Sequence, residues 1–462
     1  MVFRNFFSVG LPVSDPGVQA GLMKIEATLD YPAILQGQEA LIHAALTLTA
    51  DERPGGRARP GAFALVLDNS GSMEGRPLEM AREAARMVVR HLQPGDHFGA
   101  VVFSDAARVV VPMQKVGDRA LADRRIAAIR SEGSTNLAGG WMLGLDELRR
   151  APGELPRRVL LLSDGQLNVG ITDPAQVAQL AAQGLEKDRA RTSCLGFGDG
   201  YNEDLLGEMA RISGGAFHDA TSPESFPDIF RKELESLQRL SAQNVRVRLR
   251  RLHYCTGALV MADYPVTELP GGGIEIAVGD LVSGEARAMV FGLDVMPLPP
   301  APDLTLEGEA LVDIEIAWDE ITEGEVRARV ERVTLRVKAV QDPAQVVLDE
   351  SVLQWVAMQH AGAALRESLP HVDRGHFNGA RERVEKALES LRRYGKPDRV
   401  AEGIALLEQF LDRMRCWDVS SRKHVSTHAY RTSKPSSLHT CGDLPGRPYG
   451  KGPKASGKSG PA

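Results

Sequence analysis

The feature that most limits the fold of this chain is a regular alternation of apolar strands and amphipathic helices between Gly61 and about residue 240. Each predicted strand is a short apolar run, which is typical of parallel strands covered on both faces. The clearest runs are Phe63–Leu67, Phe98–Phe103, Val159–Leu162 and Thr192–Phe197. Between them, apolar residues recur three or four positions apart, as in Leu78 to Leu92. The pattern predicts a doubly wound, Rossmann-like α/β domain over residues 61–240.

The residues on both sides of this region have the two-residue period of β-strands instead. Ile25, Ala27 and Leu29 alternate with polar side chains before it, and a second alternating region begins at Asn244 after it. Because strands precede and follow the α/β unit, we predict that it is inserted into a β-sandwich formed by residues 15–58 and 243–342.

A row of arginines in the second β region has two possible interpretations. Arg246, Arg248 and Arg250 share one face of a predicted strand, which could be a nucleic-acid surface or the solvated face of an amphipathic strand. No aromatic residues are interleaved to stack on bases, and the formal net charge of the whole chain is only -6. We therefore favour the solvated face and expect no nucleic-acid partner.

The C-terminal part of the chain divides into two segments. Residues 343–415 carry helical periodicity, interrupted by breaks at Asp373–Asn378 and Tyr394–Pro397, and predict a small α-helical domain. Residues 416–462 hold eight Lys and Arg against two Asp and are rich in Ser and Thr. Such a composition buries little apolar surface, so we predict a basic, Ser/Thr-rich disordered tail.

Composition also gives expectations for the compartment. The four cysteines are far apart and form no C-x-x-C pair, which favours free thiols over a disulfide framework or a zinc site. The apolar patch Phe6–Val13 is short and interrupted by Ser8, Gly10 and Pro12, unlike a secretory signal. No stretch has the length of a membrane span. We expect a cytoplasmic protein without a membrane span.

The residues most indicative of chemistry follow the first strand of the α/β domain. Asp68, Ser70 and Ser72 stand there, with Gly71 and Gly75 allowing a tight loop. In open α/β sheets, ligands bind beyond the carboxyl ends of the strands. One carboxylate and two hydroxyls are hard oxygen donors of low total charge, which suit Mg²⁺ or Mn²⁺.

Two further loops offer the additional oxygens that such an ion requires. Thr135 lies in a Gly-Ser-Thr-Asn segment that precedes a predicted helix, and Asp164 ends the apolar strand Val159–Leu162. Since these loops belong to the same predicted sheet, we expect the five metal ligands to be Asp68, Ser70, Ser72, Thr135 and Asp164.

The D-x-S-x-S of Asp68 to Ser72, the later Thr135 and the strand-terminal Asp164-Gly165 resemble the metal-ion-dependent adhesion site of von Willebrand factor type A domains. The order of domains is similar to inter-alpha-trypsin-inhibitor and calcium-activated-channel architectures, in a bacterial-type form. The resemblance implies a metal site completed by an acidic side chain of a protein partner. It also implies an adaptor role, since intracellular relatives commonly work with ATPases, kinases or phosphatases.

Two alternatives remain open beside this non-enzymatic adaptor. The first is a metal-dependent hydrolase. An aspartyl phosphatase would need a second carboxylate at position 70, which is Ser70, and a serine hydrolase would need a G-x-S-x-G turn, which the N-S-G-S of residues 69–72 does not supply. The second is a structural scaffold with a silent metal site, because Asp and Ser after strands are also ordinary turn and cap residues.

Overall fold

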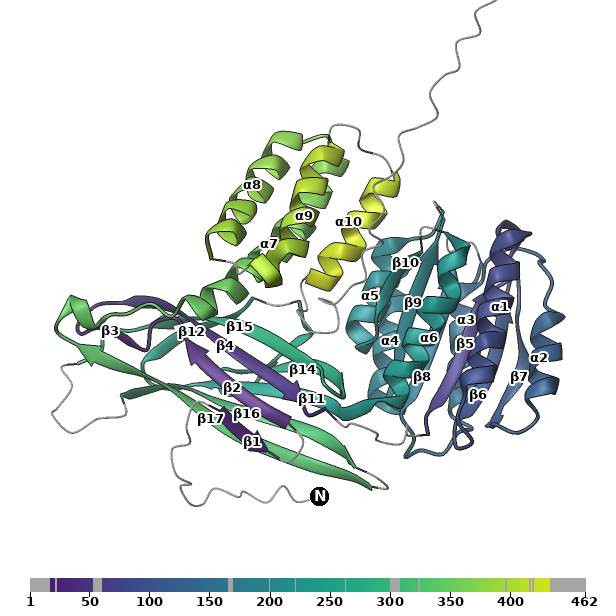
Figure 1. Ribbon diagram of the computed structural model, residues 1–462, viewed down its shortest axis with the longest axis horizontal. Coiled ribbons are helices and arrows are strands. Elements are labelled where there is room, and N and C mark those ends of the chain that lie inside the picture. Colours follow the sequence, from purple (N-terminus) through teal and green to yellow (C-terminus); the bar gives the residue numbers. More distant parts are fainter. Residues whose placement is uncertain are drawn as a thin grey trace, which may run out of the picture.

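The computed structural model describes most of the chain, and all structural statements below concern these residues. They are residues 17–20, 23–52, 60–164, 169–198, 200–220, 222–261, 263–299, 308–322, 325–394, 397–414, 417 and 419–432. The chain forms an α/β domain, two sheets of mostly antiparallel strands and a group of C-terminal helices (Figure 1).

The α/β domain contains one six-stranded sheet in the order β10-β9-β8-β5-β6-β7. Its strands are β5 (Ala62–Asp68), β6 (His97–Phe103), β7 (Ala107–Lys115), β8 (Arg157–Ser163), β9 (Ala190–Phe197) and β10 (Phe217–Ala220). All neighbours pair in parallel except β6 and β7, which are antiparallel. The chain continues from β5 to β6 on one side and later returns to β8 on the other, so a topological switch point lies between β5 and β8.

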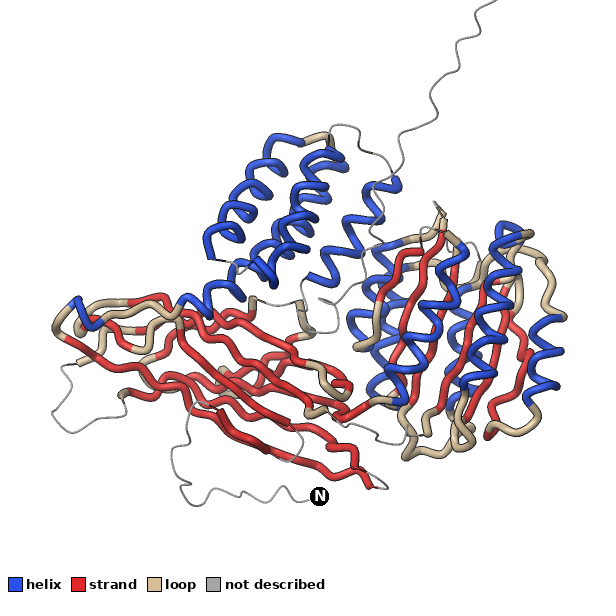
Figure 2. Tube along the Cα trace, in the orientation of Figure 1, coloured by secondary structure: helices blue, strands red, loops and turns tan. Residues whose placement is uncertain are grey.

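Helices cover both faces of this sheet (Figure 2). They are α1 (Arg76–His91), α2 (Arg119–Ala127), α3 (Leu137–Leu148), α4 (Pro174–Asp188), α5 (Glu203–Ser213) and α6 (Phe226–Gln238). Helices α1, α2 and α6 contribute to the apolar core on one face, and α3, α4 and α5 to the core on the other. All seven residues of β5 are buried, which explains why the first six, before Asp68, form an unbroken apolar run in the sequence. The predicted α/β fold is confirmed.

The strands before and after the α/β domain share two sheets. One has the order β1-β2-β4-β15-β12, and the other β13-β14-β11-β16-β17-β3. The bounds are β1 (Gly17–Ala20), β2 (Met23–Leu29), β3 (Ala33–Leu35), β4 (Ala40–Ala50), β11 (Leu240–Arg251), β12 (Cys255–Val260), β13 (Val266–Leu269), β14 (Gly273–Val282), β15 (Ala286–Val295), β16 (Glu309–Thr322) and β17 (Glu325–Val340). Both sheets contribute to one buried apolar core, in which Leu46 of β4 and Ile314 of β16 are fully covered.

The arginine row on β11 is neutralised by carboxylates of the neighbouring strands. Arg248 contacts Glu275 at 2.6 Å and Glu315 at 3.1 Å, and Arg250 contacts Asp313 at 2.5 Å. The row is thus part of an exposed ladder of alternating charges, each pair of which contributes little to stability.

The C-terminal helices are α7 (Glu350–Asp373), α8 (Phe377–Tyr394), α9 (Pro397–Arg413) and α10 (Val419–Thr432). They share an apolar core that includes Leu365, Leu388 and Phe410. The first turns of α7 also pack on β4 and β15, where Val352 and Val356 meet Ala45 and Val290. Figure 1 shows this group between the two sheets and the α/β domain.

The predicted disorder of the tail from residue 416 is wrong for Val419–Thr432, which form α10. The helix buries Val425 and Ala429 in the core shared with the other C-terminal helices. Its charged side chains also find partners on α5. Composition did not reveal this helix because its described apolar anchors are small and because Arg422 and Lys423 form ion pairs with a distant segment of the chain. The remainder of the predicted tail, residues 433–462, lies outside the described residues.

None of the described helices is both long enough and apolar enough to cross a bilayer.

Candidate metal-binding site

The site begins at the carboxyl end of β5, beside the topological switch point. Asp68 is fully buried there, and its carboxylate is held at both oxygens. The Ser70 backbone N–H donates to Oδ1 at 2.8 Å, and the Ser163 hydroxyl donates to Oδ2 at 2.9 Å. Burial, together with the charge of Asp164, raises the pKa of Asp68 to about 6, against the opposing effect of these hydrogen bonds.

The loop after β5 carries the two serines to the end of β8. A short 3₁₀ turn, Gly71–Met73, and Gly75, whose φ is +83°, fold this loop back before α1. Ser70 Oγ and Ser72 Oγ lie 3.1 Å apart, and the Ser72 hydroxyl donates to Asp164 Oδ1 at 2.9 Å. Burial also raises the pKa of Asp164. Four of the five predicted ligands are therefore linked by direct hydrogen bonds.

The fifth predicted ligand, Thr135, lies on a loop that packs against the first. The Gly71 N–H donates to the Gly133 carbonyl at 3.1 Å, and the Ser131 hydroxyl donates to the Ser70 carbonyl at 2.9 Å. Thr135 itself is buried, directly before Asn136, whose side chain caps the N-terminus of α3. The structure thus brings all three predicted loops to one edge of the sheet.

The donor set fits a small, hard divalent cation. The described residues contain no group of three or more His, Cys, Asp and Glu side chains that could hold a metal ion. Instead, two carboxylates and two hydroxyls are joined by hydrogen bonds, and Thr135 lies buried on the adjoining loop; such oxygen groups are the ligands that Mg²⁺ and Mn²⁺ prefer. Burial and the charge of Asp164 disfavour the ionised form of Asp68, and a cation bound beside both carboxylates would offset that penalty. Ser72 is exposed while the other four residues are buried, so the site opens to solvent at Ser72.

Sequence reasoning missed two supporting residues, Ser163 and Ser131. Ser163 donates a hydrogen bond to Oδ2 of Asp68, and Ser131 links the third loop to the first. Ser163 directly precedes Asp164, so its place in the motif could have indicated it. Nothing in the sequence around Ser131 distinguishes it from an ordinary turn residue.

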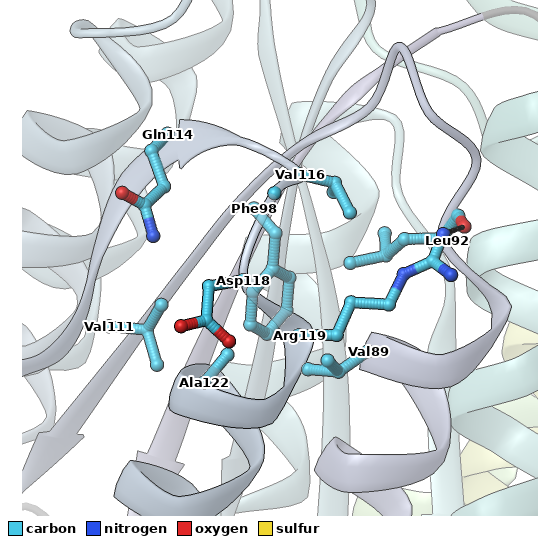
Figure 3. Close-up of a pocket in the computed structure, with 10 residues that line it drawn as sticks. Val89, Leu92, Phe98, Val111, Gln114, Val116, Asp118, Arg119 and Ala122 are labelled. Atoms are coloured by element: carbon cyan, nitrogen blue, oxygen red, sulfur yellow. Dashed lines mark hydrogen bonds between the residues drawn. The ribbon is translucent and has the colours of Figure 1, made fainter.

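A small pocket elsewhere in the domain does not belong to this site. It lies between α1, β6, β7 and α2, and Phe98, Val89 and Leu92 are among the residues that line it (Figure 3). Phe98 is the second residue of β6, and Leu92 directly follows α1. The pocket is therefore near the amino ends of the parallel strands, at the opposite edge of the sheet from Asp68.

The family model for the von Willebrand factor type A domain matches residues 63–232. An uncharacterized protein of Synechocystis sp. is 24% identical over 351 residues, which are 73% of this chain and 80% of that protein. Inter-alpha-trypsin inhibitor heavy chain H4 of Sus scrofa is 30% identical over 199 residues. These residues are 40% of this chain and 21% of that protein.

Two solved structures share the fold over most of the chain. One is a von Willebrand factor type A protein from Catenulispora acidiphila, with a TM-score of 0.67 and 16% identity over 90% of this chain and 99% of that one. The other is the ArnB paralog VWA2 from Sulfolobus acidocaldarius, with a TM-score of 0.61 and 15% identity. The match covers 89% of this chain and 99% of that one. The match to the family model and these shared folds lead to one conclusion: the chain contains a von Willebrand factor type A domain over residues 63–232.

Proposed function

We propose that the protein is a Mg²⁺-dependent interaction module that binds an acidic side chain of a protein partner. The observation that carries this proposal is the convergence of Asp68, Ser70, Ser72 and Asp164 through contacts of 2.8 to 3.1 Å, with the Thr135 loop packed against them. A divalent cation held there would supply a Lewis-acidic position for one more oxygen ligand.

The arrangement of the side chains supports a ligand that arrives from outside. Asp68 is buried and accepts a hydrogen bond from Ser163, whereas Gly71 and Ser72 are exposed. Two carboxylates would balance the +2 charge of a bound divalent cation, and a coordination position that the protein leaves open would still accept one more oxygen ligand. An Asp or Glu carboxylate of a partner satisfies this chemistry, since hard cations prefer carboxylate oxygens.

The proposed setting is the cytoplasm, with an adaptor role toward an ATPase, kinase or phosphatase system. Cys194 and Cys255, the cysteines in the described part of the chain, are free and buried, which agrees with a reducing compartment. The ATPase, kinase or phosphatase partner is inferred from the resemblance to intracellular relatives of the family.

A capture experiment tests the function. The full chain is immobilised on a resin and incubated with host extract. It is expected to retain a partner protein when Mg²⁺ is present and to release that protein when a chelator is added. Asp68→Ala should capture none, because it removes the carboxylate at the base of the site. Asp146→Ala serves as a control, since Asp146 is exposed on α3 and pairs with Arg149. Equal capture with and without the chelator would contradict the proposal.

A further inference from the structure

We propose that helix α10 is a strap that holds the loop between β9 and α5 against the metal-site edge, so that α10 docking and metal binding strengthen each other. This inference rests on the proposed metal site and concerns its regulation. It is carried by an unbroken series of contacts from Lys423 on α10 to Asp164.

The first contact is a buried lysine. Lys423 is only 3% exposed, although lysine is among the residues least often buried. Its ammonium group donates to the carbonyl of Tyr201 and to Glu203 Oε2, the latter at 2.9 Å, and lies 3.5 Å from the centre of the Tyr201 ring. A buried charge with three such partners is strongly tied to them, because losing them would leave it desolvated and unpaired.

The second contact joins three parts of the molecule at Arg422. Its guanidinium contacts Glu203, Asp204 at 3.0 Å and Asp373 at 2.9 Å. Glu203 and Asp204 open α5 in the α/β domain, whereas Asp373 ends α7. The Arg422 side chain of α10 therefore contacts both α7, in the C-terminal group, and α5, in the α/β domain.

The loop that α10 holds lies directly against the metal site. Tyr201 is buried, donates its hydroxyl to Asp219 of β10 at 2.7 Å, and packs so tightly on Gly196 that a Cβ there would lie 2.3 Å from its ring. A Cβ on Gly200 would lie 2.9 Å from the backbone carbonyl oxygen of Asp164. The backbone that carries Tyr201 thus supports the backbone that carries a proposed metal ligand.

Helix α10 is a weak element that depends on these contacts. It has 14 residues, a length at which isolated helices are marginal in water, and its sequence is mostly polar. Among the side chains of α10 that the structure describes, Val425 and Ala429 are the ones that enter the core of the C-terminal helices. Elements with few apolar contacts open at a lower cost than the rest of a fold. Helix α10 is therefore able to detach while the α/β domain stays folded.

The consequence is a reciprocal coupling. If docked α10 keeps Asp164 in its binding position, a metal ion there must favour docked α10 by the same factor. We expect a factor of about five, at the lower end of the usual range for coupled sites. A partner that displaces α10 would then weaken the metal site, and metal loss would loosen α10.

Hydrogen exchange of the full chain, combined with calorimetric titration of MgCl₂, tests the coupling. Mg²⁺ is expected to slow exchange of the α10 amides in the wild type about fivefold. Lys423→Met is expected to speed α10 exchange and to raise the Mg²⁺ dissociation constant by a similar factor. Lys386→Met is the matched control, because Lys386 is an exposed lysine on α8 that pairs with Glu382 in its own helix.

A second, milder variant keeps the test valid if Lys423→Met fails to fold. Asp204→Asn weakens one arm of the Arg422 contacts at a residue that is 67% exposed, and it should give a smaller change in the same direction. Mg²⁺ binding with no change in α10 exchange would overturn the coupling and leave the proposed function intact. Absence of Mg²⁺ binding to the wild type would overturn the proposed function itself.

Discussion

The hydroxyl of Ser72 donates a hydrogen bond of 2.9 Å to Oδ1 of Asp164, which lies 92 positions further along the chain. This bond joins the loops that follow β5 and β8, the two strands that flank the topological switch point. Because Ser72 is exposed and Asp164 is buried, the bond lies at the solvent-facing side of the candidate site.

Ser72→Ala is expected to weaken Mg²⁺ binding at least tenfold while changing the melting temperature by less than about 3 °C. Calorimetry and circular dichroism measure the two effects. A large loss of stability would mean that Ser72 is structural.

Asp68→Asn is expected to stabilise the metal-free protein at neutral pH. The pKa of Asp68 is raised from 3.8 to about 6, so its ionisation costs the fold on the order of 3 kcal/mol once the pH exceeds 6. Asparagine has nearly the same shape and carries no charge. Thermal unfolding at pH 7.5 should therefore show a higher melting temperature for Asp68→Asn without metal, and no further rise with Mg²⁺. A lower melting temperature for this variant would contradict the assigned cost.

Mg²⁺ binding is expected to weaken as the pH falls below about 6. The metal competes with the proton at Asp68, whose pKa is raised to about 6 by burial and by Asp164. Each further unit of acidification should then reduce the apparent affinity by nearly tenfold, because one proton must leave for each ion that binds. Titrations of MgCl₂ at pH 5, 6, 7 and 8 measure this slope. An affinity that is constant from pH 5 to pH 8 would exclude Asp68 from the ligand set.

A buried network beneath α6 is expected to control the stability of the α/β domain. Glu233 accepts hydrogen bonds from Arg158 at 3.0 Å and Ser193 at 2.7 Å, and contacts His218 at 2.8 Å. Glu233→Ala leaves the buried Arg158 without its counter-charge, which costs about 3–5 kcal/mol. Glu235→Ala on the same helix removes only an exposed pair with Arg231 and should cost less than about 1 kcal/mol. Urea unfolding measures both, and equal costs would contradict the network's role.

Acid unfolding should report the same network. Burial opposes ionisation of Glu233, but Arg158, His218 and Ser193 outweigh it and lower the pKa of Glu233 to about 2. Since this pKa is depressed in the fold, its stabilisation is present above the unfolded value near 4.5 and is lost as the pH falls toward 2. The wild type should lose stability over this interval more steeply than Glu233→Gln. Parallel pH profiles of the two proteins would refute this assignment.

One ion pair joins the α/β domain to the flanking sheets. Arg191 of β9 contacts Asp280 of β14, and both side chains are more than nine-tenths buried. Asp280→Ala should cost about 3–5 kcal/mol because Arg191 keeps its burial and loses its counter-charge. Asp313→Ala is the control, since Asp313 pairs with exposed Arg250. Equal destabilisation of the two variants in urea would contradict this expectation.

Much of the fold could be predicted because its strands are buried on both faces. The first six of the seven buried residues of β5, Ala62 to Leu67, appear in the sequence as one apolar run, and the helices between such runs keep their period. Helix α10 could not be predicted in this way. Its anchors, Lys423 and Arg422, appear as two charges in a basic segment, and only the fold shows that Glu203 lies opposite them. Ion pairs between distant segments leave no period in the sequence.

The meeting of the loops at the candidate site could be predicted in outline because β5 and β8 are neighbouring parallel strands whose carboxyl ends lie together. The spacing of Asp68, Ser70 and Ser72 places them in one loop, and Asp164 follows the neighbouring strand. The support from Ser131 and from the Tyr201 loop depends on backbone contacts, such as that of Gly200 with Asp164. Such contacts depend on how the loops pack, which residue type does not reveal.

Calorimetric titration of MgCl₂ into the full chain and into Thr135→Val tests whether the three loops form one metal site. Thr135 is buried on the third loop, and valine keeps its shape while removing the only oxygen of its side chain. The account predicts one ion per chain in the wild type and at least a tenfold weaker affinity in Thr135→Val, with Ser134→Ala unchanged. Binding to Thr135→Val with wild-type affinity, or no binding to the wild type, would contradict a site built from these three loops.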